Sequence, residues 1–257
     1  RFSSYWWDAT PMLKDLNIKD CGEIAFKRAM SQIGPVKIES GKYSMVIESE
    51  VASRLVTPVL NALGGYSLQQ KNSFMLDSLG KKMFPEWLNI WDRPVSVGET
   101  GSRLFDSEGV ATAEMPIVEN GVVKEYFVNT YMSRKMGVEA TVEDATRPVV
   151  LPCFAPSVAE PVEATCGKEE LMRIVGEGIL VTSFNGGNSN SATGDFSFGV
   201  EGFLFEDGKI VHPVREMLIT GNLLTLWNNL LAAGNDARFC KSKLIPTLAF
   251  GNVDFSA

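Results

Sequence analysis

The chain has 257 residues, of which 45% are hydrophobic, and a formal net charge of −7. This much apolar surface is enough for a substantial core, so we expect a soluble globular protein with a single domain over residues 1–257. The negative charge would repel a phosphate backbone, and no stripe of Lys and Arg with interleaved aromatics offsets it, which argues against nucleic-acid binding. No apolar run is long enough to span a bilayer, so no membrane insertion is expected.

The four cysteines are spaced too widely for a zinc ribbon or a dense disulfide framework. Reduced thiols are the simplest interpretation, and they favour a cytoplasmic protein. The chain begins with Arg-Phe-Ser-Ser-Tyr rather than Met and shows no signal-peptide pattern. We therefore interpret it as a trimmed chain or a fragment of a longer protein.

Two segments in the first part of the chain have the period of amphipathic helices. Asp20-Cys-Gly-Glu23 resembles a capping box, and the apolar positions up to Ile33 predict a helix packed on a sheet, which Gly34-Pro35 would end. Residues 51–63 repeat apolar side chains every four positions before Gly64-Gly65, which predicts a second helix. Pro58 lies inside it and is expected to kink or restart it.

Two hairpins are predicted from their turns. Residues 110–118 and 122–128 flank Glu119-Asn-Gly121, and residues 202–205 and 209–211 flank Glu206-Asp-Gly208. Asn-Gly and Asp-Gly favour the positive φ values of a tight turn between antiparallel strands.

The remaining segments complete the prediction of the fold class. We expect a helix over 168–175, a buried strand over 179–184, a helix over 222–233 capped by Asn222, and a long irregular connection over the proline-rich residues 148–161. Strands outnumber helices and do not alternate regularly with them. The pattern therefore favours an α+β fold with a mostly antiparallel β-sheet, sandwich or barrel-like, and several packed helices.

The polar residues give few candidates for catalysis. His212 is the only histidine, and nothing in the sequence links it to a nucleophile or an orienting acid, so a locally hydrogen-bonded strand histidine outweighs a catalytic base. Glu48 and Glu50 are two residues apart at a helix start, so their side chains should diverge instead of forming an acid/base pair.

The stretch from Phe184 to Gly199 is rich in glycine and small polar residues. It lacks Gly-Lys-Ser/Thr and is followed by a hairpin instead of a helix, which argues against a phosphate site. A turn-rich connection and a peptide-contacting loop both remain open. Within the stretch, Thr193, Gly194 and Asp195 are the candidate substrate-binding residues.

Several segments together resemble the TldD/PmbA family, whose members are also called modulators of DNA gyrase. The resemblance runs from about Asp20 to the C-terminus. The matching segments are 50–52, 74–80, 105–109, 193–197, 213–214, 221–222 and 234–236.

In the metallopeptidase branch of that family, the helix equivalent to residues 51–63 begins with His-Glu-x-x-x-His, and a cysteine near the C-terminus completes a zinc site. Aligned on Glu50, the two histidine positions are Ser49 and Arg54, and Cys240 falls near the cysteine position. A serine hydroxyl is a poor zinc ligand, and a guanidinium has no lone pair to give. The chain thus resembles the PmbA branch, also called TldE, and we expect neither a metal ion nor another cofactor.

The resemblance implies a two-subunit peptidase that cleaves unfolded peptides inside a closed cavity. The metal would belong to a TldD-like partner subunit, and this chain would help to build the cavity and hold the substrate without being catalytic itself. The family also has an N-terminal domain, which this chain is expected to lack. Two alternatives stay open: a stand-alone homodimeric peptide-binding module using residues 185–199, and an independent hydrolase using His212 with Cys240 or a serine.

Overall fold

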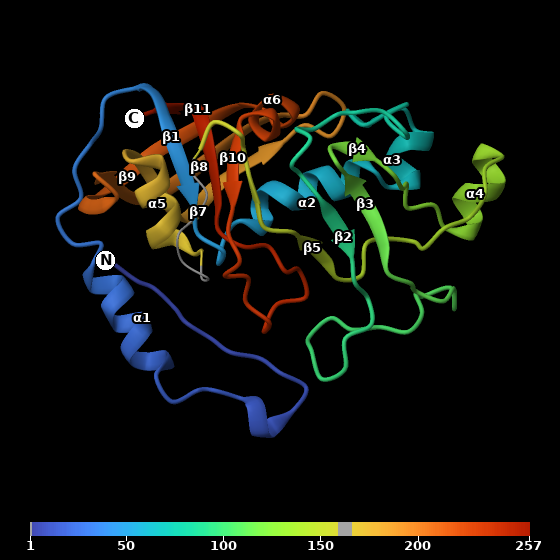
Figure 1. Cartoon of the computed structure of the whole chain (residues 1–257), viewed down its shortest axis with the longest axis horizontal. Helices are drawn as coiled ribbons and strands as arrows, with labels where there is room; N and C mark the ends of the chain where they lie inside the picture. The colour runs from blue at the N-terminus through green and yellow to red at the C-terminus, as the bar shows by residue number, and fades with distance from the viewer. Residues whose placement is uncertain (1, 159–165) are drawn as a thin grey trace.

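The computed structural model describes residues 2–158 and 166–257 (Figure 1). The helices are η1 (Leu13–Asp15), α1 (Cys21–Met30), α2 (Ser53–Ala62), α3 (Gly65–Gln69), α4 (Thr130–Met136), α5 (Lys168–Val175) and α6 (Leu223–Asn228). The strands are β1 (Gly41–Ile47), β2 (Ile90–Asp92), β3 (Met115–Glu119), β4 (Val122–Val123), β5 (Pro148–Val150), β6 (Cys153–Phe154), β7 (Gly178–Ser189), β8 (Asp195–Glu206), β9 (Lys209–Asn222), β10 (Leu230–Ala233) and β11 (Leu248–Ser256).

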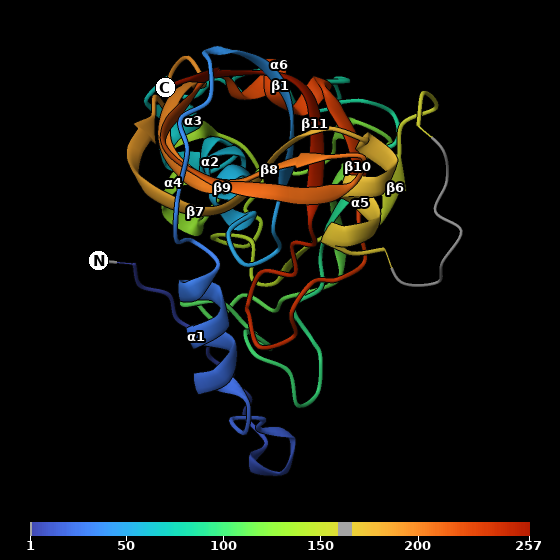
Figure 2. The same ribbon diagram turned by 90° about the vertical axis from the view of Figure 1, so that its left-hand side faces the viewer.

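The larger sheet closes into a barrel. In the described part of the chain its seven strands have the order β1-β7-β8-β9-β11-β10-β6, and β1 pairs with β11 as well as with β7. Strands β1, β7, β8, β9 and β11 therefore form a ring, which is seen as an oval in Figure 2. The β1–β7 pairing is parallel and the others are antiparallel. A smaller antiparallel sheet has the order β4-β3-β2-β5, so the predicted α+β, barrel-like fold is confirmed.

Helix α2 is confirmed, and it brings the two sheets together. Its apolar face is buried, and Leu55 and Val59 belong to one hydrophobic cluster with Ile47 of the barrel and Val118 of the smaller sheet. Burying a side chain such as Leu55 completely stabilises the fold by about 1.5–3 kcal/mol. The helix continues through Pro58 without a restart.

Both predicted hairpins are confirmed, but the lengths of their strands differ from the prediction, because a turn sequence does not specify strand length. Asn120 and Gly121 have φ values of 51° and 75°, and Asp207 and Gly208 have 50° and 71°, as tight turns with two left-handed residues require. The first turn joins the short strands β3 and β4. The second joins β8 and β9, which extend far beyond the predicted segments.

Helix α1 forms where predicted, but its packing was predicted wrongly. No residue of α1, which lies wholly within the described chain, is buried, and Phe26 is 64% exposed. In both views the helix projects away from the barrel (Figures 1 and 2). Asp20 also makes no side-chain cap bond among the described contacts of the helix.

Three other segments differ from the prediction. Residues 222–233 form α6, capped by Asn222 as expected, but the helix ends at Asn228 and β10 follows. Residues 148–158 contain β5 and β6 instead of an irregular connection, while 159–161 lie outside the described residues. The glycine-rich stretch is mostly strand, because β7 continues to Ser189 and β8 starts at Asp195. Helix α5 occupies Lys168–Val175 as predicted.

No helix in the described part of the chain has the length and apolar character needed to cross a membrane.

Candidate functional site

A large cleft, with a volume of about 1250 Å³, lies beside the start of α2. Its walls come from α1, α2, the strands β7, β8 and β9, and the segment at the N-terminus. Glu50 and Arg54, two of the three positions aligned with His-Glu-x-x-x-His, lie in the wall together with Glu48, whereas Ser49 is not among the residues that line the cleft. Thr57 and Pro58 continue the wall along α2.

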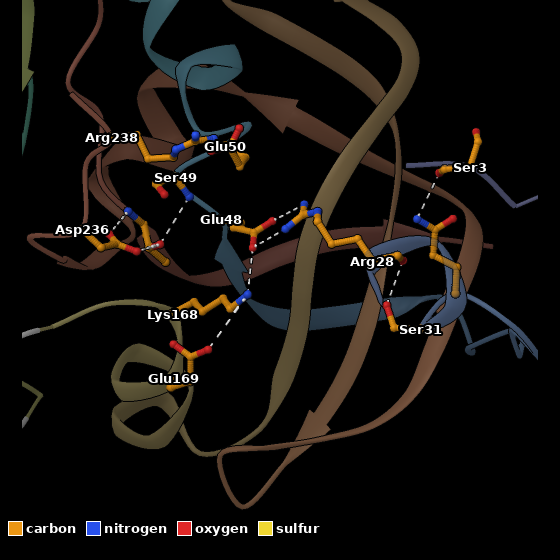
Figure 3. Close-up of polar contacts among 12 residues, drawn as sticks. Ser3, Arg28, Ser31, Glu48, Ser49, Glu50, Lys168, Glu169, Asp236 and Arg238 are labelled. Atoms are coloured by element: carbon orange, nitrogen blue, oxygen red, sulfur yellow. Dashed lines mark hydrogen bonds and ion pairs between the residues drawn. The ribbon is translucent and has the colours of Figure 1, made fainter. Parts of the chain in front are cut away.

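Glu48 follows β1 directly and is buried, with 5% of its surface exposed. Arg28 of α1 donates two hydrogen bonds to it, at 3.0 and 2.7 Å, and the Lys168 ammonium lies 2.9 Å from its Oε1 (Figure 3). Burial alone would raise the pKa of Glu48, but the hydrogen bond from Arg28 and the charge of Lys168 outweigh it and hold the pKa below the ordinary value. Glu48 is therefore a fixed anion.

Glu50 has two cationic partners of its own, so the two glutamates diverge as predicted. Its carboxylate is hydrogen-bonded by the Arg238 guanidinium, and the Lys241 ammonium lies 3.1 Å from its Oε2. Lys241 also donates to the backbone carbonyl of Glu50 at 2.6 Å. A carboxylate held in this way is compensated by charges of the same chain.

The backbone of Ser49 and the guanidinium of Arg54 both make contacts within the chain. Ser49 is 7% exposed, and its backbone N–H donates to Thr247 Oγ1 at 3.3 Å. The hydroxyl of Thr247 in turn donates to Asp236 at 2.6 Å. Arg54 donates to the Gly187 carbonyl at 2.8 Å and lies over the Phe198 ring at 5.1 Å, which joins α2 to the β7–β8 hairpin.

Cys240 is buried, with 6% of its surface exposed, close to the Glu50 ion pairs. Burial raises the pKa of its thiol, and the charges of Asp8 and Glu50 act in the same direction, while Arg238 and Lys241 act against it. A protonated thiol is a poor metal ligand and a poor nucleophile. The structure thus places Cys240 near Glu50, where burial disfavours ionisation of its thiol.

His212 lies on β9, opposite Leu204 of β8, and also lines the cleft. Its Nδ1 is the one buried side-chain nitrogen or oxygen in the described residues that lacks a hydrogen-bond partner. This differs from the predicted locally hydrogen-bonded histidine. No contact described in the structure joins His212 to Cys240 or to a serine.

Thr193, Gly194 and Asp195 form the tip of the β7–β8 hairpin. Thr193 Oγ1 donates to Asp195 at 2.7 Å, and the Asn222 amide donates to Asp195 at 3.0 Å. These bonds hold the pKa of the Asp195 carboxyl below its ordinary value. Gly194 has φ +79° and packs against Phe74, a residue of the cleft wall. The tip therefore borders the cleft.

Comparison with known proteins identifies the family of the chain. Residues 40–257 match the family described as the PmbA/TldA metallopeptidase C-terminal domain. The chain belongs to this family. It is 36% identical over 215 residues to a protein of Haemophilus influenzae named metalloprotease PmbA homolog, and the match covers 84% of this chain and 46% of that protein.

Solved structures of the family have the same fold. One is a protein of Bacteroides thetaiotaomicron VPI-5482 whose name refers to modulation of DNA gyrase, with a TM-score of 0.93 and 44% identity, covering 100% of this chain and 56% of that one. TldE of Thermococcus kodakarensis, with a TM-score of 0.78 and 20% identity, covers 95% and 56% and shares the fold. The chain spans about half the length of the curated relatives it matches.

The names of the relatives imply a metal ion, but the residues of this chain do not fit one. No group of three or more His, Cys, Asp or Glu side chains within residues 2–158 and 166–257 is arranged to hold a metal. Near Glu50 lie the buried Ser49 and the Cys240 thiol, whose pKa is raised. Arg238 and Lys241 are paired with Glu50, and their charges would repel a dication.

The sequence pointed to Glu50 but not to the four cations that hold the two glutamates: Arg28, Lys168, Arg238 and Lys241. They come from distant parts of the chain and belong to no short motif.

Proposed function

We propose that this chain is the partner subunit without a metal in a TldD/TldE-type metallopeptidase complex that cleaves unfolded peptides. Its partner is a TldD-like subunit, which carries the catalytic metal. The observation that carries the proposal is the pairing of Glu50 with Arg238 and Lys241. Because these cations hold the Glu50 carboxylate, it is not free to act as a base. They would also repel a dication placed next to it.

The cleft supports a role in holding the substrate. Its volume of about 1250 Å³ is at or above the range typical of small-ligand pockets, which suits an extended peptide. The wall combines the aromatic rings of Phe184 and Phe198 with the polar side chains of Thr182, Ser183 and Asn188. Such a mixture accommodates different side chains along a peptide.

The hairpin tip has a place in the same proposal. Because Gly194 packs on Phe74 of the cleft wall, Thr193 and Asp195 can contact a peptide that leaves the cleft at this end. We further propose that residues 1–257 act as one domain in a cytoplasmic complex, consistent with the four free cysteines of the structure.

The proposal is tested by co-purifying the full-length protein with a sister subunit that carries His-Glu-x-x-x-His. Peptide cleavage by the complex and by each subunit alone is then measured with and without a metal chelator. We expect chelator-sensitive cleavage by the complex that exceeds the cleavage by either subunit.

Two results would contradict the proposal. Chelator-insensitive cleavage by this chain alone would place the chemistry elsewhere, with His212 as the first residue to change. Peptide binding by a homodimer that does not assemble with the sister subunit would favour the stand-alone binding module.

A further inference from the structure

The N-terminal segment of residues 2–8 crosses one end of the cleft, and we call it the strap. It has no regular secondary structure, and Ser3, Ser4 and Tyr5 form part of the cleft wall. Gln32 of the turn after α1 donates to the Ser3 carbonyl at 3.4 Å, and Arg238 donates to the Trp7 carbonyl. An extended segment of the chain thus already lies where we propose that a peptide binds.

The Trp6 ring of the strap lies against two arginines of the glutamate cluster, and the Trp7 ring also lies 5.5 Å from the Arg238 guanidinium carbon. The Trp6 ring centroid lies 4.0 Å from the Arg238 guanidinium carbon and 5.4 Å from that of Arg28. The edge N–H groups of both arginines are engaged by Glu50 and Glu48. Their planar faces are therefore held in place and left for an aromatic ring, the group that a guanidinium face prefers.

The same arrangement occurs a second time along the strap. The Phe2 ring lies 5.2 Å from the guanidinium carbon of Arg215 on β9. Arg215 donates from Nε to Glu201 Oε1 at 3.0 Å, so a glutamate again holds the edge of the arginine while a ring covers its face. Glu201 and Arg28 both line the cleft.

The strap itself is held by few contacts. No residue of the strap, whose residues 2–8 are all described, is buried, and Tyr5 is 69% exposed. Its described attachments are the rings of Phe2, Trp6 and Trp7 on arginines, two bonds to its backbone carbonyls, and the Asp8 carboxylate, which accepts from the Asn17 N–H at 2.8 Å. Such a segment opens at small free-energy cost compared with the barrel strands.

We propose that two subsites for aromatic side chains of a peptide adjoin the cleft, one at Arg28 and Arg238 and one at Arg215. The strap occupies them with Trp6 and Phe2 as an internal ligand. A peptide with aromatic residues in the spacing of Phe2 and Trp6 displaces the strap and takes both subsites. This inference rests on the proposed peptide-holding role and adds to it a preference for aromatic residues.

The test measures binding of two fluorescein-labelled peptides to the full chain by fluorescence anisotropy. One peptide carries Phe and Trp in the spacing of the strap, and the other carries Leu at both positions. In the variant with Phe2→Ala, Trp6→Ala and Trp7→Ala, which removes all three strap rings that lie over these arginines, the aromatic peptide should bind about tenfold tighter than to the unaltered chain. It should also bind about tenfold tighter than the leucine peptide to the same variant.

Two further variants control the test. Arg238→Lys in the vacated background keeps the charge next to Glu50 but removes the planar face, so the aromatic preference should fall. Leu13→Ala, at a position that is 85% exposed and not part of the cleft wall, should leave both affinities unchanged. Thermal unfolding confirms that each variant is folded.

Equal affinities for the two peptides in the vacated variant, or binding of neither, would overturn the aromatic subsites. Failure of the proposed function is detected separately, as the absence of assembly and chelator-sensitive cleavage with the sister subunit. Assembly with cleavage and no aromatic preference would thus remove this inference alone.

Discussion

The carboxylate of Glu50 is paired with the guanidinium of Arg238, although the two residues are 188 positions apart in the chain. With Lys241, this pairing places two positive charges of the protein where the family resemblance places a zinc ion. Glu50, the one residue of the His-Glu-x-x-x-His pattern that this chain keeps, is therefore paired with Arg238 and not with a metal. The central claim of our account follows from this relationship.

Restoring the two histidines should not restore metal binding. In the double variant Ser49→His and Arg54→His, Arg238 and Lys241 still lie at Glu50 and repel a dication. We expect no retained zinc by elemental analysis after dialysis. Adding Arg238→Gln and Lys241→Gln should allow zinc to bind, with circular dichroism confirming that the variant is folded. Stoichiometric zinc in the double variant would show that the two cations do not block the site.

Glu48 should make stability depend on pH in the acid range. Its pKa is below the model-compound value of 4.5 in the folded protein, so its stabilising effect is complete above pH 4.5 and is lost as the pH falls through the lower folded value. Arg28 and Lys168 are 22% and 32% exposed, so water partly compensates for the loss of the carboxylate. Glu48→Gln should therefore lower the free energy of unfolding by about 2 kcal/mol at neutral pH.

The measurement is urea unfolding of the unaltered chain and of Glu48→Gln between neutral and acid pH. The difference in the free energy of unfolding between the two proteins should become smaller as the pH falls below 4.5. Curves that stay parallel over the whole range would contradict the assigned role of Glu48.

Two strand glycines should respond differently to a methyl group. A Cβ at Gly202 of β8 would lie 1.8 Å from the Leu180 carbonyl oxygen, whereas one at Gly251 of β11 would meet Leu231 side-chain atoms at 3.6 Å. Gly202→Ala forces the backbones of β7 and β8 apart and should cost about 3 kcal/mol. Gly251→Ala should change stability by less than about 1 kcal/mol. Thermal unfolding of both variants checks this, and equal effects would show that the β7–β8 approach is looser than described.

The three buried cysteines should resist alkylation while the protein is folded. Burial raises the pKa of Cys153 to about 12 and that of Cys166, together with nearby carboxylates, to about 11, and it also raises the pKa of Cys240. Iodoacetamide at roughly pH 8 should therefore modify them slowly, and quickly once urea unfolds the chain. Mass spectrometry locates the adducts. Fast modification of Cys240 in the folded protein would mean that it is an activated thiolate.

The features predicted from the sequence were those that neighbouring residues determine. Asn120-Gly121 and Asp207-Gly208 set their own turns through backbone conformation, and the apolar period of residues 51–63 specified which face of α2 is buried. The exposed position of α1 could not be read in this way. Its amphipathic pattern predicted packing that the described chain does not provide.

Long-range pairing explains what was missed. Leu230 to Ala233 continue an apolar helical pattern, yet they form β10 because they pair with β11 and β6. Residues 184–189 become strand because β8 returns beside them. The site follows the same rule, since Glu48 is held by residues 20 and 120 positions away.

The most direct test of the central claim compares two single changes in the assembled complex. Glu50→Gln is made in this chain, and the equivalent glutamate of the metal-bearing sister subunit is changed to glutamine in a second complex. Co-purification confirms that both complexes assemble, and peptide cleavage is then measured. Our account predicts that the first complex still cleaves peptides and that the second does not. Loss of cleavage in the assembled complex with Glu50→Gln would contradict it and would make Glu50 a catalytic residue.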